Sequence, residues 1–270
     1  MKTLQEKGLY KTAVNDGEVQ GLRKWNWPTR VSSEILPENL LGKTVIDVGA
    51  GPSHSLGDLI VERDGRYIAI DVNEGLVEIQ RKLGREVYQA DICNVSKVIP
   101  PTIERTHVIS HTRLVFMHLS PEKMPQAVHE LATVGSMGYV LDTNWKNFIQ
   151  SASGPRLRDF IDITLDFAQQ NGIDLYHGGK LKQLLIDTLG DAYEINECIF
   201  SEGIANHYDE LINLAQRQMG FFNQNKNDTE IERLKTIIKS FEKARQKNDP
   251  KEFFESPHTF HVVSFAEKRT

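Results

Sequence analysis

The chain has 270 residues and a mass of 30.7 kDa, which is typical of one large domain or of one domain carrying an insertion. Hydrophobic residues make up 39% and charged residues 26%, and the mean hydropathy is −0.40, which excludes collagen-like, disordered and membrane-embedded classes. The net charge of −5 argues against nucleic acid as the main partner, because phosphate backbones attract basic surfaces. No apolar run approaches the ~18 residues of a spanning helix, so no membrane partner is expected.

The number of cysteines and the N-terminal sequence indicate the cellular compartment of the protein. Cys93 and Cys198 are too few for a disulfide framework or a four-cysteine zinc site. The N-terminal sequence MKTLQEKGLYK is charged and lacks the apolar region of a signal peptide. We therefore expect a reduced, cytoplasmic protein.

The first half of the chain alternates short apolar runs with amphipathic stretches. The runs predict strands at residues 44–48, 67–71, 87–92, 106–111 and 138–141. The stretches between them predict helices at residues 55–62, 74–83 and 121–134. This alternation is typical of repeated βαβ units, and it predicts an α/β fold with a doubly wound, mostly parallel, seven-stranded Rossmann-like sheet.

The second half is richer in helices. Helical patterns cover residues 156–170, 181–189, 205–219 and 229–247, and strand patterns cover residues 193–200 and 258–265. We expect three parts from this order: an N-terminal helical lid at 1–40, an α/β core at 41–200 and 257–270, and a helical cap insertion at 201–256. The apolar stripe that Ile231 begins predicts the underside of the cap, with self-association through the cap as the alternative.

A glycine loop follows the first predicted strand directly. Asp47, Gly49 and Gly51 form the pattern Asp-x-Gly-x-Gly before a predicted helix. Ligands of open parallel sheets bind at the carboxyl ends of the strands, where glycine lets the backbone approach them closely. The dinucleotide fingerprint needs a third glycine where this chain has His54. The loop therefore favours S-adenosylmethionine over NAD.

Two further acidic residues end the next two predicted strands. Asp71 ends the second strand, where a carboxylate can accept hydrogen bonds from both hydroxyls of a ribose. Asp91 ends the third strand and is placed to accept from an adenine amino group. Val72 and Ile92 would flank the purine faces. Three acidic strand ends beside a glycine loop predict a nucleoside-binding site.

Five segments, taken together, resemble the class I S-adenosylmethionine-dependent methyltransferases: TVIDVGAGPS, YIAIDV, YQADIC, SHTRLVFMHLSPEKMPQAV and GYVLDTNW. The resemblance covers about residues 40–145 and implies S-adenosylmethionine as cofactor. It places the methionyl part beside Gly49 and Gly51, and the ribose at Asp71. It also places the adenine at Asp91 with Ile92, and the methionyl ammonium at the backbone of Thr112.

The acceptor of the methyl group would lie beyond the ends of the fourth and fifth strands. A general base is needed if the acceptor is a phenol, an alcohol or a protonated amine, and His111 is the first choice because it adjoins Thr112. Arg30 is a candidate for the methionine carboxylate. The other candidates, all for binding the acceptor, are Trp27, Asn144, His177, His207 and Phe222.

Three hypotheses on function follow. The first is methyl transfer to O, N or C of a small, possibly aromatic, metabolite. The second is an RNA or protein methyltransferase, and the third is a non-catalytic relative that binds the cofactor. A metal is not expected, because Asp142 is the one good carboxylate near the fifth strand and hard cations need several oxygen ligands.

Overall fold

The computed structural model describes residues 27–52, 55–152, 154–201, 204–224, 227–247 and 259–268. The expectations for residues 1–26, for His54 and for the side chains of Trp27 and His207 lie outside this description. No helix in the described part of the chain combines the length and the apolar composition that crossing a membrane requires.

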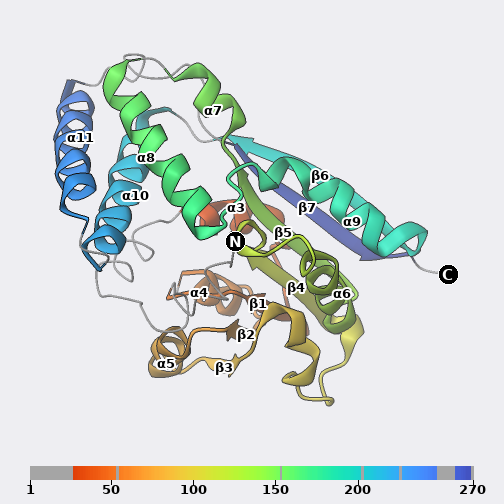
Figure 1. The fold of residues 1–270 in the computed structure, drawn as a ribbon. Helices are drawn as coiled ribbons and strands as arrows, with labels where there is room; N and C mark the ends of the chain where they lie inside the picture. Colours follow the sequence, from red (N-terminus) through yellow and green to blue (C-terminus); the bar gives the residue numbers. More distant parts are fainter. Residues whose placement is uncertain are drawn as a thin grey trace.

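Seven strands form one sheet in the order β3-β2-β1-β4-β5-β7-β6 (Figure 1). Strands β1 to β5 pair in parallel, and β7 runs antiparallel to both β5 and β6. The predicted α/β fold with a mostly parallel, seven-stranded sheet is therefore confirmed. The strands are β1 (Thr44–Val48), β2 (Arg66–Asp71), β3 (Glu86–Gln89), β4 (Val108–Arg113), β5 (Met137–Asn144), β6 (Tyr193–Ser201) and β7 (Thr259–Glu267).

Helices cover both faces of this sheet, since parallel strands are buried on both sides. One face packs on α6 and α9 through residues such as Val128 and Leu185, and the other packs on α4 through Leu56 and Ile60. The helices are α3 (Trp27–Ile35), α4 (Ser55–Glu62), α5 (Glu74–Lys82), α6 (Met124–Val134) and α9 (Leu181–Leu189). Short 3-10 turns connect them: η1 (Ile92–Lys97), η2 (Arg105–His107), η3 (Phe116–His118), η4 (His177–Lys180) and η5 (Gly190–Ala192).

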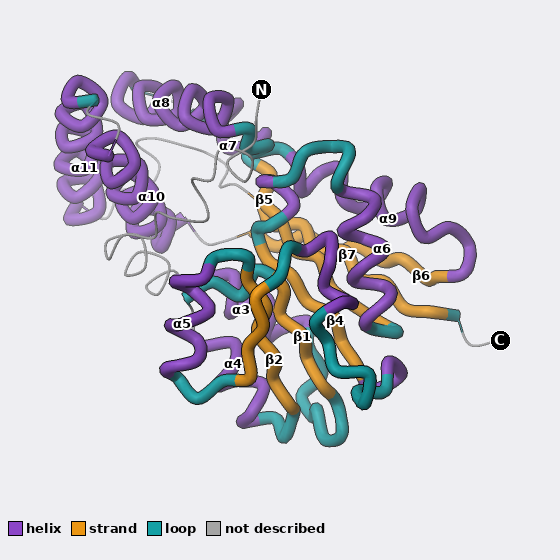
Figure 2. Tube along the Cα trace, turned by 60° about the horizontal axis from the view of Figure 1, so that its bottom comes forward, coloured by secondary structure: helices purple, strands orange, loops and turns teal. Residues whose placement is uncertain are grey.

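A second helical group has its own apolar core. It contains α7 (Lys146–Ser151), α8 (Pro155–Asn171), α10 (Ile204–Gln224) and α11 (Asp228–Lys247), and Figures 1 and 2 show α8, α10 and α11 side by side at one end of the molecule. We call α7, α8, α10 and α11 the helical layer. Met117 and Trp145, which follow β4 and β5, pack into its core, so the layer is joined to the carboxyl ends of these strands.

The layer differs from the predicted cap in one respect. Helices α10 and α11 lie between β6 and β7, within the expected insertion at 201–256. Helix α8 precedes β6 and was expected in the α/β core, but Phe160 of α8 packs edge-to-face on Phe241 of α11. The apolar stripe of α11 packs in one cluster with α8 and α10 of the same chain, with Leu234 and Phe241 fully buried. Self-association through the cap stays a prediction.

Two element ends also differ from the sequence expectation. The third strand stops at Gln89, and Asp91 instead begins η1, where its Oδ1 accepts a hydrogen bond from the Cys93 N–H at 2.9 Å. The fourth strand continues to Arg113. Both differences lie at the carboxyl edge of the sheet.

Candidate active site at the carboxyl edge of the sheet

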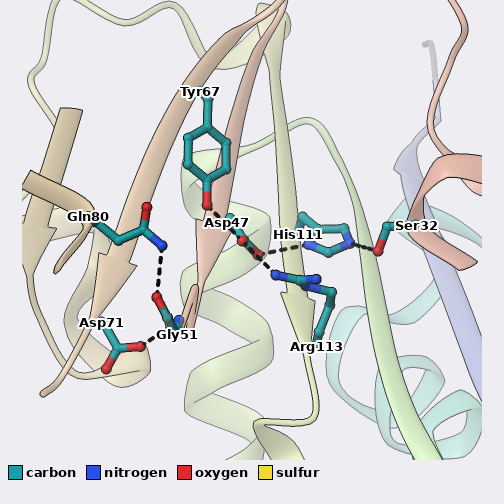
Figure 3. A network of polar contacts seen from close by, with 8 residues as sticks. All are labelled: Ser32, Asp47, Gly51, Tyr67, Asp71, Gln80, His111 and Arg113. Atoms are coloured by element: carbon teal, nitrogen blue, oxygen red, sulfur yellow. Dashed lines mark hydrogen bonds and ion pairs between the residues drawn. The ribbon is translucent and has the colours of Figure 1, made fainter. Parts of the chain in front are cut away.

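The glycine loop has the backbone geometry that its sequence predicts. Gly49 and Gly51 both have positive φ, 75° and 62°, a conformation that disfavours other residues. A Cβ at Gly49 would collide with Val115, whereas one at Gly51 would meet no atom of the described residues within 4 Å. The loop is held on two sides, because Gly51 donates its N–H to Asp71 Oδ2 at 3.0 Å and accepts from Gln80 Nε2 at 2.8 Å (Figure 3).

Asp71 is the buried carboxylate beside this loop. Its Oδ1 accepts from the Asn73 N–H at 2.9 Å, and burial raises its pKa to about 6 against the opposing effect of these backbone hydrogen bonds. The backbone N–H groups of Gly51 and Asn73 use two acceptor positions of this carboxylate, and a backbone hydrogen bond from Val72 also lowers its pKa. Since a carboxylate has about four acceptor positions, these three bonds leave Asp71 able to accept a further hydrogen bond.

The residues expected around a purine lie close by in the fold. Val72 directly follows β2 and its carbonyl accepts from Gln89 Nε2 at 3.1 Å. Ile92 is buried at the start of η1. Asp91 Oδ2 lies 3.9 Å from Lys123 Nζ. The ends of β2 and β3 thus bring one partly exposed carboxylate and two apolar side chains to the same edge of the sheet.

A buried polar network lies on one face of the sheet, next to the glycine loop in the sequence. Asp47 is 0% exposed, and its Oδ2 accepts from Tyr67 Oη at 3.0 Å and lies 3.3 Å from Arg113 Nη2. Its Oδ1 lies 2.9 Å from His111 Nδ1, and His111 Nε2 lies 3.0 Å from Ser32 Oγ of α3 (Figure 3). We call these five residues the Asp47 network.

The charge states in this network follow from its contacts. Burial alone would raise the pKa of Asp47, but Arg113 and His111 lower it below its ordinary value. Burial lowers the pKa of His111, outweighing the effect of Asp47. An ionised carboxylate only accepts hydrogen bonds, so Nδ1 of the neutral imidazole donates to Asp47 and Nε2 accepts from the Ser32 hydroxyl. The network pairs one anion with one cation.

These contacts change the expected roles of three residues. Asp47 was expected to bind cofactor, but its oxygens are used inside the protein. His111 was expected to be a general base, yet it is 0% exposed and both ring nitrogens have partners. This geometry favours a positioning role for His111, and proton transfer by it stays a prediction. Arg30 lies on the exposed side of α3 beside Glu34, so the structure does not bring it to the site.

A different polar group lies on the opposite face of the sheet, at the end of β5. Asp142 is 0% exposed and accepts from the N–H groups of Met117 at 2.7 Å and Thr143 at 2.8 Å. Burial raises its pKa to about 7. His177, from η4, stacks on Phe116 with ring centroids 6.0 Å apart. The turn η4 packs on the end of β5, since a Cβ at Gly178 would lie 2.8 Å from the Asp142 carbonyl oxygen.

The polar atoms of this second group are incompletely paired. Neither ring nitrogen of His177 has a hydrogen-bond partner among the described residues, and Nδ1 lies 3.9 Å from Asp174 Oδ2. Burial lowers the pKa of His177 to about 4. Thr112, on the same face as Asp142 by strand alternation, has a buried Oγ1 that is likewise unpaired within the described part of the chain. We call Thr112, Asp142, Asp174 and His177 the Asp142 group.

The two remaining candidates for binding the acceptor, Asn144 and Phe222, lie in different parts of the fold. Asn144 ends β5, where its Oδ1 accepts from the Lys146 N–H at 3.1 Å and its Nδ2 lies 3.4 Å from His261 Nε2. Phe222 is buried inside the helical layer, edge-to-face with Phe167, so the structure places it in the core of that layer.

Sequence reasoning missed Ser32, Tyr67, Arg113 and Asp174 as parts of these sites. Tyr67 and Arg113 had a usable signal, because Asp47 pairs with Ala69 and His111, and residues two positions away on the same strands lie on the same face of the sheet. Ser32 had none, since it lies 79 residues from His111. Among the described residues, no three histidine, cysteine or acidic side chains are grouped so that they could hold a metal ion.

No protein-family model matches the sequence, and no curated protein is significantly similar to it. Solved structures resemble its fold. The [4+2]-cyclase SpnF matches with a TM-score of 0.59 and 13% identity, over 100% of this chain and 98% of that one. Phosphoethanolamine N-methyltransferase 2 of Haemonchus contortus, solved with S-adenosyl-L-methionine, has a TM-score of 0.58 and 11% identity over 97% of this chain.

This chain spans 60% of the length of the Haemonchus protein. The cyclopropane synthase MmaA2 of Mycobacterium tuberculosis matches with a TM-score of 0.54 and 10% identity, over 88% of this chain and 82% of that one. At these identities the likeness shows the fold. The class that the comparisons define is therefore the Rossmann-like fold of S-adenosylmethionine-dependent methyltransferases, and activity has to be argued from the site.

Proposed function

We propose that this protein binds S-adenosylmethionine and transfers its methyl group to a small molecule. The observation that carries the proposal is the glycine loop at the end of β1. Two positive-φ glycines lie there, Gly51 has open space beside it among the described residues, and its N–H is bonded to the Asp71 carboxylate. The loop lies at the switch point of the sheet, since both β2 and β4 pair with β1.

The residues present fit the cofactor. Open space at Gly51 admits a ligand close to the backbone, and Asp71 can accept from a ribose hydroxyl. Asp91 with Val72 and Ile92 would hold the adenine, and the backbone at Thr112 would meet the methionyl ammonium. When bound, the cofactor supplies a methyl group on a positively charged sulfur, which is already activated for transfer. The protein then has mainly to orient the acceptor and exclude water.

The Asp142 group is the proposed acceptor side. Thr112 and Asp142 come from the ends of β4 and β5, next to the loop that would hold the cofactor, and His177 packs against the same strand ends. Unpaired buried polar atoms destabilise a fold unless a ligand or water completes their hydrogen bonds. A neutral imidazole accepts a hydrogen bond, so His177 would orient an acceptor that carries an O–H or N–H group. Asn144 is a further candidate at this strand end.

A small acceptor is favoured over RNA or protein. The helical layer is joined to the carboxyl ends of β4 and β5 through Met117 and Trp145, which places a bulky element beside the proposed acceptor side. Two of the neighbours bear on this in their names: the Haemonchus protein is a phosphoethanolamine N-methyltransferase and the Mycobacterium protein is a cyclopropane synthase. The net charge of −5 also suits an acceptor that is not a polyanion.

One observation favours a second candidate. The neighbour SpnF is named as a [4+2]-cyclase and is matched over nearly its whole length. A chain of this fold that binds the cofactor but catalyses a different reaction on a small molecule is therefore the alternative. Binding of cofactor together with absence of methylated product from a metabolite extract would favour it.

The test begins with cofactor binding. Calorimetry with S-adenosylhomocysteine should show binding by the wild type, and NAD should not bind. Asp71→Ala should weaken binding by roughly 1.5–3 kcal/mol, the scale of a hydrogen bond to a charged group. The matched control is Glu62→Ala, which removes an exposed carboxylate from α4 and should leave the affinity unchanged. Equal affinity for Asp71→Ala in a folded protein would contradict the ribose assignment.

A further inference from the structure

Helix α3 is linked through His111 of β4 to β1, the strand that precedes the glycine loop. Ser32, in the middle of α3, donates to His111 Nε2, and His111 Nδ1 donates to Asp47, two residues before Gly49. Ser32, His111 and Asp47 are all 0% exposed. Two successive hydrogen bonds therefore connect α3 through His111 of β4 to Asp47, near the end of β1 and just before the loop (Figure 3).

The order serine, histidine, aspartate is also that of a hydrolytic triad, and burial distinguishes the two roles. A nucleophilic serine has to reach a substrate. Ser32 has no exposed surface, and its side chain faces His111 of the sheet. The chain of hydrogen bonds therefore connects two elements and does not serve hydrolysis.

A second connection joins α3 to the other side of the loop. Arg63 follows α4, the helix that begins after the glycine loop. Its Nη2 donates to the Ser33 carbonyl at 3.0 Å, and its Nη1 donates to the Leu36 carbonyl at 2.9 Å. Carbonyls at a helix end lack partners within the helix, so Arg63 completes the end of α3. Helix α3 is thus connected to both elements that flank the loop, to β1 through His111 and to the end of α4 through Arg63.

Apolar packing supplies a third connection. Ala50, between the two loop glycines, belongs to the same buried cluster as Leu36 and Leu40, which follow α3, and Leu56 of α4. A shift of α3 would therefore disturb the loop through packing as well as through hydrogen bonds, because packed cores respond to small changes of shape.

We propose that His111 is a positioning residue that couples the docking of α3 to cofactor binding at the glycine loop; this rests on the proposed function. The residues of α3 need not touch the cofactor for this coupling. Linkage makes it reciprocal, so cofactor binding also strengthens the docking of α3 by the same factor.

The test uses neighbouring serines on α3. Ser32→Ala removes the buried donor to His111, and Ser33→Ala is the matched control, because Ser33 Oγ donates only locally to the Arg30 carbonyl at 2.6 Å. Ser32→Ala should weaken S-adenosylhomocysteine binding about tenfold in calorimetry, within the usual range of coupling between sites. Ser33→Ala should bind as the wild type does.

Two further measurements separate coupling from simple stabilisation. Saturating S-adenosylhomocysteine should slow hydrogen exchange of the α3 amides in the wild type. In Ser32→Ala the same ligand should slow this exchange by a smaller factor. His111→Asn keeps a donor toward Asp47 but loses the acceptor for Ser32. It should weaken binding as Ser32→Ala does, and the double variant should be no weaker than either single one.

The outcomes are distinct. Unchanged affinity in Ser32→Ala, together with unchanged protection of α3 by the ligand, would overturn the coupling and leave the hydrogen bonds a stabilising role alone. A wild type that does not bind S-adenosylhomocysteine would overturn the proposed function, and the coupling with it. Loss of affinity in Ser32→Ala and not in Ser33→Ala supports the inference.

Discussion

The two buried polar sites on opposite faces of the sheet shift the pKa of their carboxylates in opposite directions. Asp47 meets a cation, a phenol and an imidazole, and its pKa lies below the ordinary value even though it is fully buried. Asp142, equally buried, accepts only from backbone N–H groups in its hydrogen bonds, and its pKa rises to about 7. The first site is fixed in one charge state. In the second site the pKa of Asp142 lies near neutral, and the ring nitrogens of His177 and Oγ1 of Thr112 have no hydrogen-bond partner among the described residues, as expected of a site that a ligand completes.

The largest effect is expected from Asp47→Asn, which breaks the paired site. Arg113, with an 8% exposed side chain, would lose the carboxylate that neutralises it. Removing one partner of a buried ion pair destabilises by about 3–5 kcal/mol, because the other charge stays buried. Denaturant unfolding at pH 8 would measure this loss.

Asp142→Asn is the control for that variant. Among the described residues no cation contributes to the pKa of Asp142, so the amide removes a buried charge without leaving an opposite charge unpaired. The amide keeps one acceptor oxygen for the two backbone N–H groups that Asp142 binds, so at pH 8 this variant should lose less unfolding free energy than Asp47→Asn does. A loss as large as that of Asp47→Asn would show that the two carboxylates are held alike, contrary to the comparison.

The next effect is a dependence of stability on pH. The pKa of Asp142 is raised, so the folded state holds its proton to higher pH than the unfolded state, and the contribution to stability is lost as pH rises from about 4 toward 7. Between pH 5 and 7.5 the wild type should lose roughly 2–3 kcal/mol relative to Asp142→Asn, at about 1.4 kcal/mol for each pH unit below the folded pKa. Parallel curves for the two proteins would show that Asp142 ionises normally.

The sequence predicted the parts of the fold that local patterns determine. Strands β1 and β2 are continuous apolar runs, as expected of strands buried on both faces, and both were located within one residue. The glycine loop followed from the Gly49 and Gly51 spacing. The place of Asp71 beside the loop followed from its position at a strand end.

The parts that were missed depend on contacts between distant segments. The pattern at residues 156–170 predicts a helix but not its partners, and α8 proved to pack with α10 and α11. His111 was placed correctly at the end of β4, yet its role depends on Ser32 of α3, which no spacing rule connects to it. Likewise, the sequence showed Asp142 as a strand-end acid, and the fold shows that no described cation contributes to its pKa.

The smallest expected effect comes from His177→Phe in the Asp142 group. Phenylalanine would keep the stacking on Phe116 and remove two buried nitrogens that lack hydrogen-bond partners among the described residues. Replacing unsatisfied buried polar atoms by apolar ones should raise the unfolding free energy by about 1 kcal/mol at pH 7.5. Thermal unfolding would measure this gain, with His107→Phe as the control, because His107 is exposed and substitution there should change stability by less than about 0.5 kcal/mol. A stabilised variant that no longer methylates metabolites in an extract would show that His177 is retained for a ligand at the expense of stability. A destabilised variant would show instead that the ring nitrogens are already satisfied inside the fold, and the contrast between the two sites would then rest on Asp142 alone.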